Sequence, residues 1–169
     1  MTNLEAARQL IRQMQDAGVD EFCVCAGSRN SPLLAVLGQL SADNRQPTTG
    51  TPRLFSFVDE RSAAFFALGR MKLRGKPTAV VTTSGTAVGE LLPATIEAHY
   101  SGLPLILITA DRPSRFRGTG APQTIEQLGI FGPYASTSID TWTHDEPLHI
   151  NIEFDEPLID EELPTPGTA

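Results

Sequence analysis

Four short apolar segments recur along this chain, and a helical pattern follows most of them. They are Phe22–Ala26, Leu54–Val58, Thr78–Thr83 and Leu103–Thr109. The last is apolar on both faces, which is typical of a strand in a parallel sheet that helices cover on both sides. The alternation therefore predicts an α/β fold, built as a three-layer sandwich around a mostly parallel sheet. A length of 169 residues fits one such domain.

The predicted helices begin at capping signals. Thr2–Glu5 is a capping box that opens a helix with a single apolar stripe. Ser31 is the expected N-cap of a second helix, with Pro32 at its first position. Three more helices are expected over residues 59–73, 84–100 and 124–128, and a polar surface loop over Ser41–Pro52.

The two last apolar segments, Tyr134–Ile139 and Leu148–Phe154, do not simply extend this alternation. Only eight residues separate them, whereas a parallel crossover needs roughly a dozen or more. They form an antiparallel hairpin, or they lie apart in the sheet, or one of them is not a strand. We expect the domain to span residues 1–158, and residues 159–169 to be an acidic linker or disordered tail.

The net charge of −7 comes from the C-terminal part of the chain. Nine acidic residues and no Lys or Arg lie between Asp140 and Glu162, so the rest of the chain is close to neutral. Since the sequence has no basic patch, nucleic acid is not an expected partner. No apolar run reaches the roughly 18 to 20 residues that span a bilayer. The first helix also lacks the features of a signal peptide, so we expect a cytoplasmic protein.

The cysteines and histidines do not predict a metal site. Cys23 and Cys25 are expected to be buried free thiols on opposite faces of their strand. The three histidines, His99, His144 and His149, are too scattered to complete a ligand set with them.

Glu60 is the residue with the least evident structural role. It follows the second apolar segment and stands beside Asp59, which is by itself a suitable helix N-cap. A charge at the carboxyl end of a buried strand lies where open α/β sheets bind their ligands. Glu60 could also be only a favourable acid in the first turn of its helix. Val58 and the neighbouring phenylalanines predict an apolar environment around it.

Three more loops are expected at the same sheet edge as Glu60, because each follows a predicted strand. They contain hydroxyl groups, two arginines and helix N-termini. Arginines and helix N-termini both bind anions favourably. The loops are residues 27–31, 83–86 and 111–113. A small ligand with carboxylate or phosphate groups is implied. Plainer explanations stay open, with Ser84 as a helix cap and Arg112 as the partner of Asp111.

The same loops resemble those of the MenD family of thiamine-diphosphate (ThDP) enzymes, the 2-succinyl-5-enolpyruvyl-6-hydroxy-3-cyclohexene-1-carboxylate (SEPHCHC) synthases. The resemblance runs from the first helix to Leu158. It rests on Cys25-Ala26-Gly27-Ser28-Arg29-Asn30-Ser31-Pro32-Leu33, Asp59-Glu60-Arg61-Ser62-Ala63, Thr82-Thr83-Ser84-Gly85-Thr86-Ala87-Val88, Thr109-Ala110-Asp111-Arg112-Pro113 and Gly120-Ala121-Pro122-Gln123-Thr124-Ile125. Family members are much longer and carry a pyrimidine-binding (Pyr), a middle and a diphosphate-binding domain. This chain resembles the Pyr domain alone.

The resemblance implies a role for each candidate residue. Glu60 would be catalytic: it would bond N1′ of the cofactor's aminopyrimidine and promote the tautomer that deprotonates the thiazolium ring. Ser84 and Gly85 would also bind the cofactor. The family positions that contact the carboxylated substrate or intermediate are matched by Ser28, Arg29, Arg112 and Gln123.

The resemblance further implies a carboligase, a type of transferase, in menaquinone or phylloquinone biosynthesis. It would decarboxylate 2-oxoglutarate and join the remaining four-carbon unit to isochorismate, with ThDP and Mg²⁺ as cofactors. The motif that holds diphosphate and magnesium in the family is absent from this sequence. Those ligands would come from the diphosphate-binding domain of a second subunit in a homodimer or tetramer, so the isolated domain should be inactive.

Two features depart from the family. Pro122 replaces an asparagine contact of some members, and the link Thr141–Pro147 is shorter than the helix that members have there. Two alternatives also stay open: a non-catalytic module that binds a small carboxylate on the same fold, and the Pyr domain of another ThDP decarboxylase. The joint presence of Ser28-Arg29 and Asp111-Arg112-Pro113 favours the MenD family over the second alternative.

Overall fold

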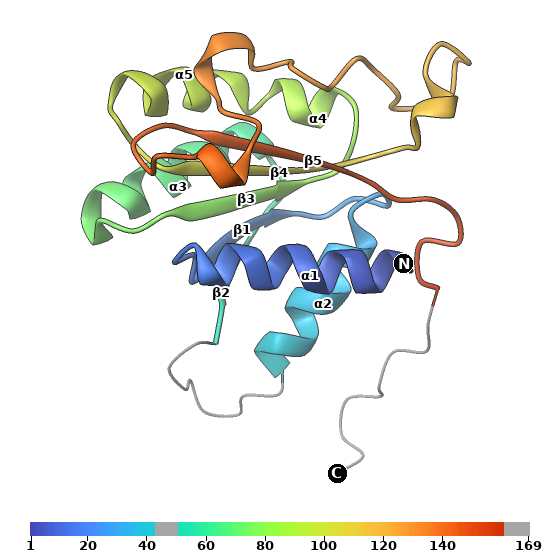
Figure 1. The fold of residues 1–169 in the computed structure, drawn as a ribbon, viewed down its shortest axis with the longest axis horizontal. Coiled ribbons are helices and arrows are strands. Elements are labelled where there is room, and N and C mark those ends of the chain that lie inside the picture. The colour runs from blue at the N-terminus through green and yellow to red at the C-terminus, as the bar shows by residue number, and fades with distance from the viewer. Residues whose placement is uncertain (43–50, 161–169) are drawn as a thin grey trace.

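The computed structural model describes residues 1–42 and 51–160. In these residues five strands form one sheet in the order β2-β1-β3-β4-β5, and every neighbouring pair is parallel. The α/β fold is therefore confirmed, with a sheet that is parallel throughout (Figure 1). The strands are β1 (Glu21–Cys25), β2 (Arg53–Phe57), β3 (Thr78–Thr82), β4 (Leu105–Asp111) and β5 (Leu148–Glu153).

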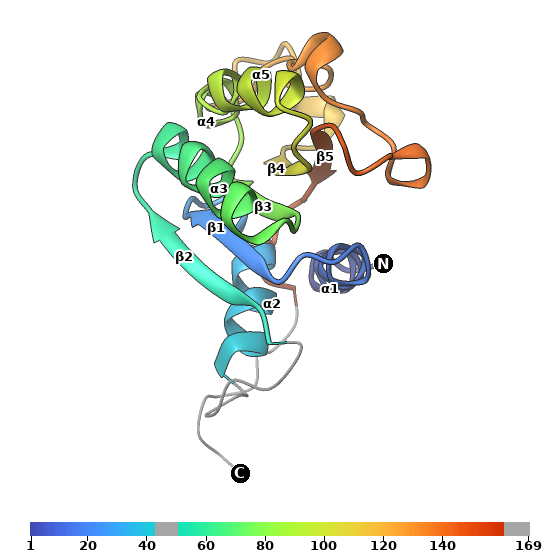
Figure 2. The same cartoon turned by 90° about the vertical axis from the view of Figure 1, so that its left-hand side faces the viewer.

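Helices cover both faces of the sheet, as Figure 1 and Figure 2 show. One face carries α1 (Asn3–Asp16) and α2 (Ser31–Ala42). The other carries α3 (Glu60–Arg74), α4 (Thr86–Gly89) and α5 (Leu92–Tyr100). Successive strand residues point to opposite faces, so Ile106 packs in the core under α1 and α2 and Leu107 in the core under α3 and α5. Two apolar cores thus enclose the sheet.

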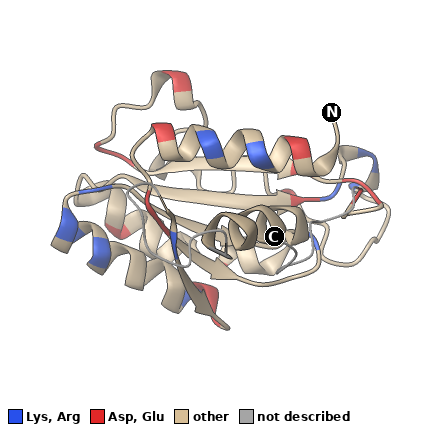
Figure 3. Ribbon diagram, turned by 90° about the horizontal axis from the view of Figure 1, so that it is seen from below, with Lys and Arg blue, Asp and Glu red and all other residues tan. Residues whose placement is uncertain are grey.

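The two best-predicted helices form for the reasons read from the sequence. α1 has the predicted capping box, and its buried stripe consists of Leu4, Ala7, Leu10, Ile11 and Met14. Its outer side carries both signs of charge (Figure 3). Asp59 caps α3 by accepting a hydrogen bond of 2.6 Å from the backbone N–H of Ser62. Hydrogen bonds from the side chain and the backbone of Ser62 lower the pKa of the Asp59 carboxyl.

Ion pairs join α3 to the start of β1, at the end of the sheet where the strands begin. Arg70 makes two hydrogen bonds of 2.8 and 2.6 Å to the fully buried carboxylate of Glu21. Arg74 does the same to Asp20, at 2.6 and 2.8 Å, and lowers the pKa of that carboxyl to about 2. These bidentate pairs fasten the end of α3 to the start of β1. They lie at the edge opposite the candidate loops.

The structure corrects the predicted N-terminal parts of two helices. The carbonyl of Asn30 accepts the first helical bond of α2, from Leu34, at 3.1 Å. Ser31 is therefore the first helical residue and not the N-cap. The predicted helix over residues 84–100 is broken, because α4 ends at Gly89 and α5 begins at Leu92. Pro93 has no N–H to donate to the carbonyl four residues earlier, which explains the break.

The segment between β4 and β5 differs most from the prediction. Residues 124–128 are not helical. Tyr134–Ile139 is not a strand either: two 3₁₀ turns, Gly132–Tyr134 and Ile139–Thr141, occupy its ends, and one bridge joins Ser136 to Leu148. Of the three alternatives for the last two segments, the third is thus confirmed. β5 is free to pair with β4 in parallel because the whole connection of residues 112–147 makes the crossover.

The cysteine prediction was half right. Cys23 and Cys25 are both buried and free. They share the core under α3 and α5, however, because residues two apart in a strand point to the same face. Burial raises the pKa of each thiol to about 12, so both stay protonated at neutral pH.

Two predicted segments lie largely outside the described residues: the loop Ser41–Pro52 and the tail of residues 159–169. Asp160, the last described residue, accepts a hydrogen bond from the backbone N–H of Asn3 at the start of α1. The proposed domain limits remain a prediction. None of the helices within residues 1–42 and 51–160 is long and apolar enough to cross a membrane.

Candidate functional site

The carboxyl ends of the parallel strands meet at one edge, as the sequence predicted. The chain leaves β1 towards β2, while β3 lies on the other side of β1, so the strand order reverses between β1 and β3. Open α/β sheets bind ligands at such a switch point. Here the turns after the two strands touch, since a β-carbon on Gly27 would lie only 2.5 Å from the β-carbon of Thr83. Position 27 therefore requires glycine.

Glu60 lies beside this contact. It is the first residue of α3 and is half-buried. Its Oε1 is 3.5 Å from the hydroxyl of Thr82, which is at the limit of a hydrogen bond. No other residue in the described ranges bonds the Glu60 carboxylate. Its charge adds to burial in raising the pKa of the Cys25 thiol, which shows that Glu60 lies close to the end of β1.

Val58 does not form the apolar environment that was expected around Glu60. Val58 is 100% exposed. The reason is that β2 is an edge strand and Val58 follows its last residue, so this side chain has no neighbouring strand to pack on.

The turn after β3 contains one buried polar group for which residues 1–42 and 51–160 supply no partner. The hydroxyl of Thr83 has no hydrogen-bond partner among the described residues, although Thr83 is only 7% exposed. Ser84 is also buried, and no side chain in the described residues caps α4, so Ser84 is not a helix cap. Buried hydroxyls are normally satisfied by protein, water or ligand. Thr83 thus marks a position where a ligand can complete a hydrogen bond.

Arg29 is placed differently from the sequence-based expectation. It is 4% exposed, and its Nη1 donates to the carbonyl of Phe154 at 3.0 Å. Its Nη2 donates to the Glu156 carboxylate, also at 3.0 Å. The charge is therefore paired inside the chain with the segment after β5. Ser28, by contrast, is exposed, and its carbonyl accepts a hydrogen bond from the Ser31 hydroxyl.

Arg112 and Gln123 lie on one loop over Gly85. The Nε of Arg112 donates to the carbonyl of Pro122 at 3.0 Å, and this bond closes the loop. Gln123 is exposed and has a φ of 53°. A β-carbon on Gly85 would lie 2.9 Å from the β-carbon of Gln123, so the two residues are in direct contact. The ionic partner of Asp111 is Arg117, at 3.2 Å, and not Arg112.

Gln127, which no sequence motif singles out, is fully buried at the centre of this edge. Its Oε1 accepts from the backbone N–H of Gly85 at 3.1 Å. Its Nε2 donates to the carbonyl of Ala110 at 3.1 Å and to Oδ1 of Asn151 at 2.7 Å. Asn151 in turn donates to Asp111 at 3.1 Å. The network joins segments far apart in the chain, which one sequence cannot reveal.

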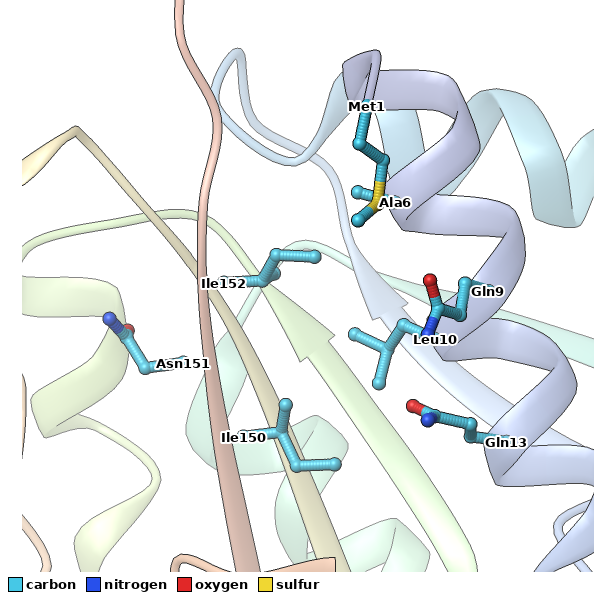
Figure 4. Close-up of a pocket in the computed structure, with 8 residues that line it drawn as sticks. All are labelled: Met1, Ala6, Gln9, Leu10, Gln13, Ile150, Asn151 and Ile152. Carbon is cyan, nitrogen blue, oxygen red and sulfur yellow. The ribbon is translucent and has the colours of Figure 1, made fainter.

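Within the described residues, no group of three or more His, Cys, Asp or Glu side chains is arranged to hold a metal ion. A shallow groove of about 250 Å³ lies elsewhere, between α1 and β5 (Figure 4). Leu10, Ile150 and Ile152 point into it, and Asn151 points away. None of the predicted site residues lines this groove.

Residues 4–130 match the model of a protein family described as "Thiamine pyrophosphate enzyme, N-terminal TPP binding domain". Similar relatives include proteins of Bdellovibrio bacteriovorus (46% identical over 97% of this chain), Akkermansia muciniphila (46% over 89%) and Synechococcus sp. (39% over 92%). Each of these is named 2-succinyl-5-enolpyruvyl-6-hydroxy-3-cyclohexene-1-carboxylate synthase.

The chain spans about a third of the length of these relatives, between 29% and 32%. The family model, however, covers well over half of the chain and all four candidate loops. The chain therefore belongs to the thiamine pyrophosphate enzyme family and carries the N-terminal TPP binding domain of that family.

Proposed function

We propose that this chain is the Pyr domain of a MenD-type SEPHCHC synthase and forms the half of the active site that binds the aminopyrimidine of ThDP. The observation that carries the proposal is the position of Glu60. Its carboxylate lies at the switch-point edge, beside Thr82 and the end of β1, and makes only one long contact within the described residues. The names of the relatives support the choice of reaction.

The residues at this edge fit an aminopyrimidine. Glu60 offers carboxylate oxygens to a ring nitrogen, and the Thr83 hydroxyl has no partner among the described residues. Gly27 and Gly85 allow the turns to approach closely. When bound, ThDP supplies the carbanion chemistry, while the protein positions it. The proposed part of Glu60 is to hold a proton in a hydrogen bond with N1′ and so act in general acid–base catalysis.

The substrate side would be formed by the loop over Gly85. Arg112 and Gln123 are at least partly accessible there, and a guanidinium suits a carboxylate such as those of 2-oxoglutarate and isochorismate. Ser28 is exposed near the same edge. Arg29 would contribute only if Glu156 gave up its ion pair, so in this conformation its role is to fix the turn after β1.

The remaining parts of the active site would come from outside the chain. We propose that Mg²⁺ and the diphosphate are held by the diphosphate-binding domain of a second subunit, in a cytoplasmic homodimer or tetramer. Exposed apolar side chains on β2, on α3 and between them support a partner surface on this side of the domain. They are Leu54, Val58, Phe65, Phe66 and Leu73, with exposed fractions from 36% to 100%.

The test supplies this chain with the remaining domains of the Bdellovibrio relative. Release of CO₂ is then measured with ThDP and Mg²⁺, from 2-oxoglutarate with and without isochorismate and, separately, from pyruvate. Formation of the joined product from both substrates supports the proposal. CO₂ release from pyruvate alone would assign the domain to another ThDP decarboxylase. A folded assembly that releases CO₂ from neither acid would favour the non-catalytic module.

A further inference from the structure

We propose that Gln127 is a positioning residue of this site, which fixes the turn after β3 and the loop carrying Gln123 relative to each other. The inference rests on the proposed function, because these are the segments assigned to cofactor and substrate. Gln127 itself contacts neither ligand. It acts through the backbone of Gly85.

The side chain of Gln127 uses its amide fully. A glutamine amide has two donor protons and an acceptor oxygen. The oxygen accepts from Gly85, and the two protons bond Ala110 and Asn151. One fully buried side chain thus joins the turn after β3, the end of β4 and the middle of β5.

Gly85 depends on this bond for its orientation. It has a φ of 83° and stands at the N-cap of α4, a helix of only four residues, where no described side chain caps the helix. The C=O and N–H of a trans peptide point in opposite directions. Because the N–H of Gly85 points at Gln127, the carbonyl of Ser84 is turned away from Gln127. The bond to Gln127 therefore fixes the orientation of the peptide between Ser84 and Gly85.

The same bond also determines where Gln123 lies. Gln127 is the last residue of the loop that closes over Gly85, and Gln123 touches Gly85 four residues earlier. The backbone N–H of Gln127 bonds Ile125 at 2.9 Å, which makes this end of the loop compact. An apolar side chain of the same length would fill the space but leave Gly85, Ala110 and Asn151 without their partner. The turn and the loop would then lose their common anchor.

The experiment compares Gln127→Met with Glu126→Gln, a change at the exposed neighbouring residue. In the 169-residue chain, hydrogen exchange of the Gly85 amide and the urea midpoint are measured. In the assembled enzyme, the Kd of ThDP and the KM and kcat for 2-oxoglutarate are measured. Because Gln127→Met loses one positioned hydrogen bond, the Gly85 amide should exchange about tenfold faster and the Kd of ThDP should be about tenfold higher. Glu126→Gln should match the wild type.

A merely structural role gives a different result. Gln127→Met would then lower the urea midpoint, yet the exchange of Gly85 relative to other core amides and the Kd of ThDP would match the wild type. That result overturns the inference. If Gln127→Met does not fold, Gln127→Asn is judged by the same criteria, since its amide is one methylene shorter and loses the bond to Gly85 while staying polar. Failure of the wild-type assembly to bind ThDP would contradict the proposed function, whereas the exchange of Gly85 tests the anchor independently.

Discussion

The α-carbon of Gly27 packs directly on the side chain of Thr83, so that a β-carbon at position 27 would lie 2.5 Å from the β-carbon of Thr83. This contact joins the turns after β1 and β3 at the point where the strand order reverses. The shape of the candidate site therefore depends on the absence of a side chain at position 27.

Gly27→Ala should destabilise the chain by about 1 to 3 kcal/mol, because the added methyl group must displace the turn of Thr83. Gly38 in α2 provides the matched control, since a β-carbon at that position would meet no atom within 4 Å. Gly38→Ala should stabilise the helix by about 0.5 to 1 kcal/mol. Urea unfolding measures both. Equal stability of Gly27→Ala and the wild type would show that the turns do not touch.

Arg29→Ala should lower the free energy of unfolding by about 2 kcal/mol, because a buried guanidinium loses hydrogen bonds to charged and carbonyl groups. Arg112→Ala is the control. Arg112 is less buried, and its guanidinium donates to the carbonyl of Pro122, so its loss should cost at most about 1 kcal/mol. Equal costs for the two variants would contradict a structural role of Arg29.

His149 should make the stability depend on pH between about 6.5 and 4. Burial lowers the pKa of His149 to about 4, partly opposed by the charge of Asp111. The unfolded chain therefore binds a proton below its pKa of about 6.5 while the folded chain stays neutral. Stability is fully present above pH 6.5 and falls by about 1.4 kcal/mol per pH unit towards pH 4, about 3 kcal/mol in all.

The variant His149→Gln removes this titration and keeps a polar atom near the Thr109 hydroxyl, which lies 2.8 Å from Nε2 of His149. Its stability should change less between pH 6.5 and 4 than that of the wild type. Asp20, with a lowered pKa of about 2, acts below this range. Parallel curves for the two proteins would rule out His149 as the source.

Those parts of the fold that depend on local patterns could be predicted from the sequence. The continuous apolar run before Asp111 predicts a buried parallel strand, and Asp59 predicts the start of α3. The segment Tyr134–Ile139 has the composition of a strand, but its edge position was taken by Leu148–Glu153, which pairs with β4 over its whole length. Tertiary pairing, and not local propensity, decided this case.

Some residues of the candidate site could be predicted from local patterns and others could not. Glu60, Ser84 and Gly85 lie at the predicted edge because the topology alone brings strand ends together. The ion pair of Arg29 could not be predicted because its partner Glu156 is 127 residues away in the chain. Gln127 was missed because a polar residue that follows Glu126 is typical of an exposed position. Buried hydrogen-bond networks join distant segments and leave no periodic signal in one sequence.

Glu60, in the function proposed here, acts on the cofactor and does not support the fold. Glu60→Gln removes the proton-holding carboxylate and keeps its shape, and the neighbouring Asp59→Asn keeps a good helix cap. Neither change should alter the free energy of unfolding by more than about 0.5 kcal/mol. The two variants therefore separate catalysis from folding at adjacent positions.

The most direct measurement is the rate of CO₂ release from 2-oxoglutarate by the assembled enzyme, at saturating ThDP, for the wild type and these two variants. We predict a rate lower by a factor of about 10² to 10⁴ for Glu60→Gln and an almost unchanged rate for Asp59→Asn. A Glu60→Gln enzyme with the rate of the wild type would contradict a catalytic role of Glu60.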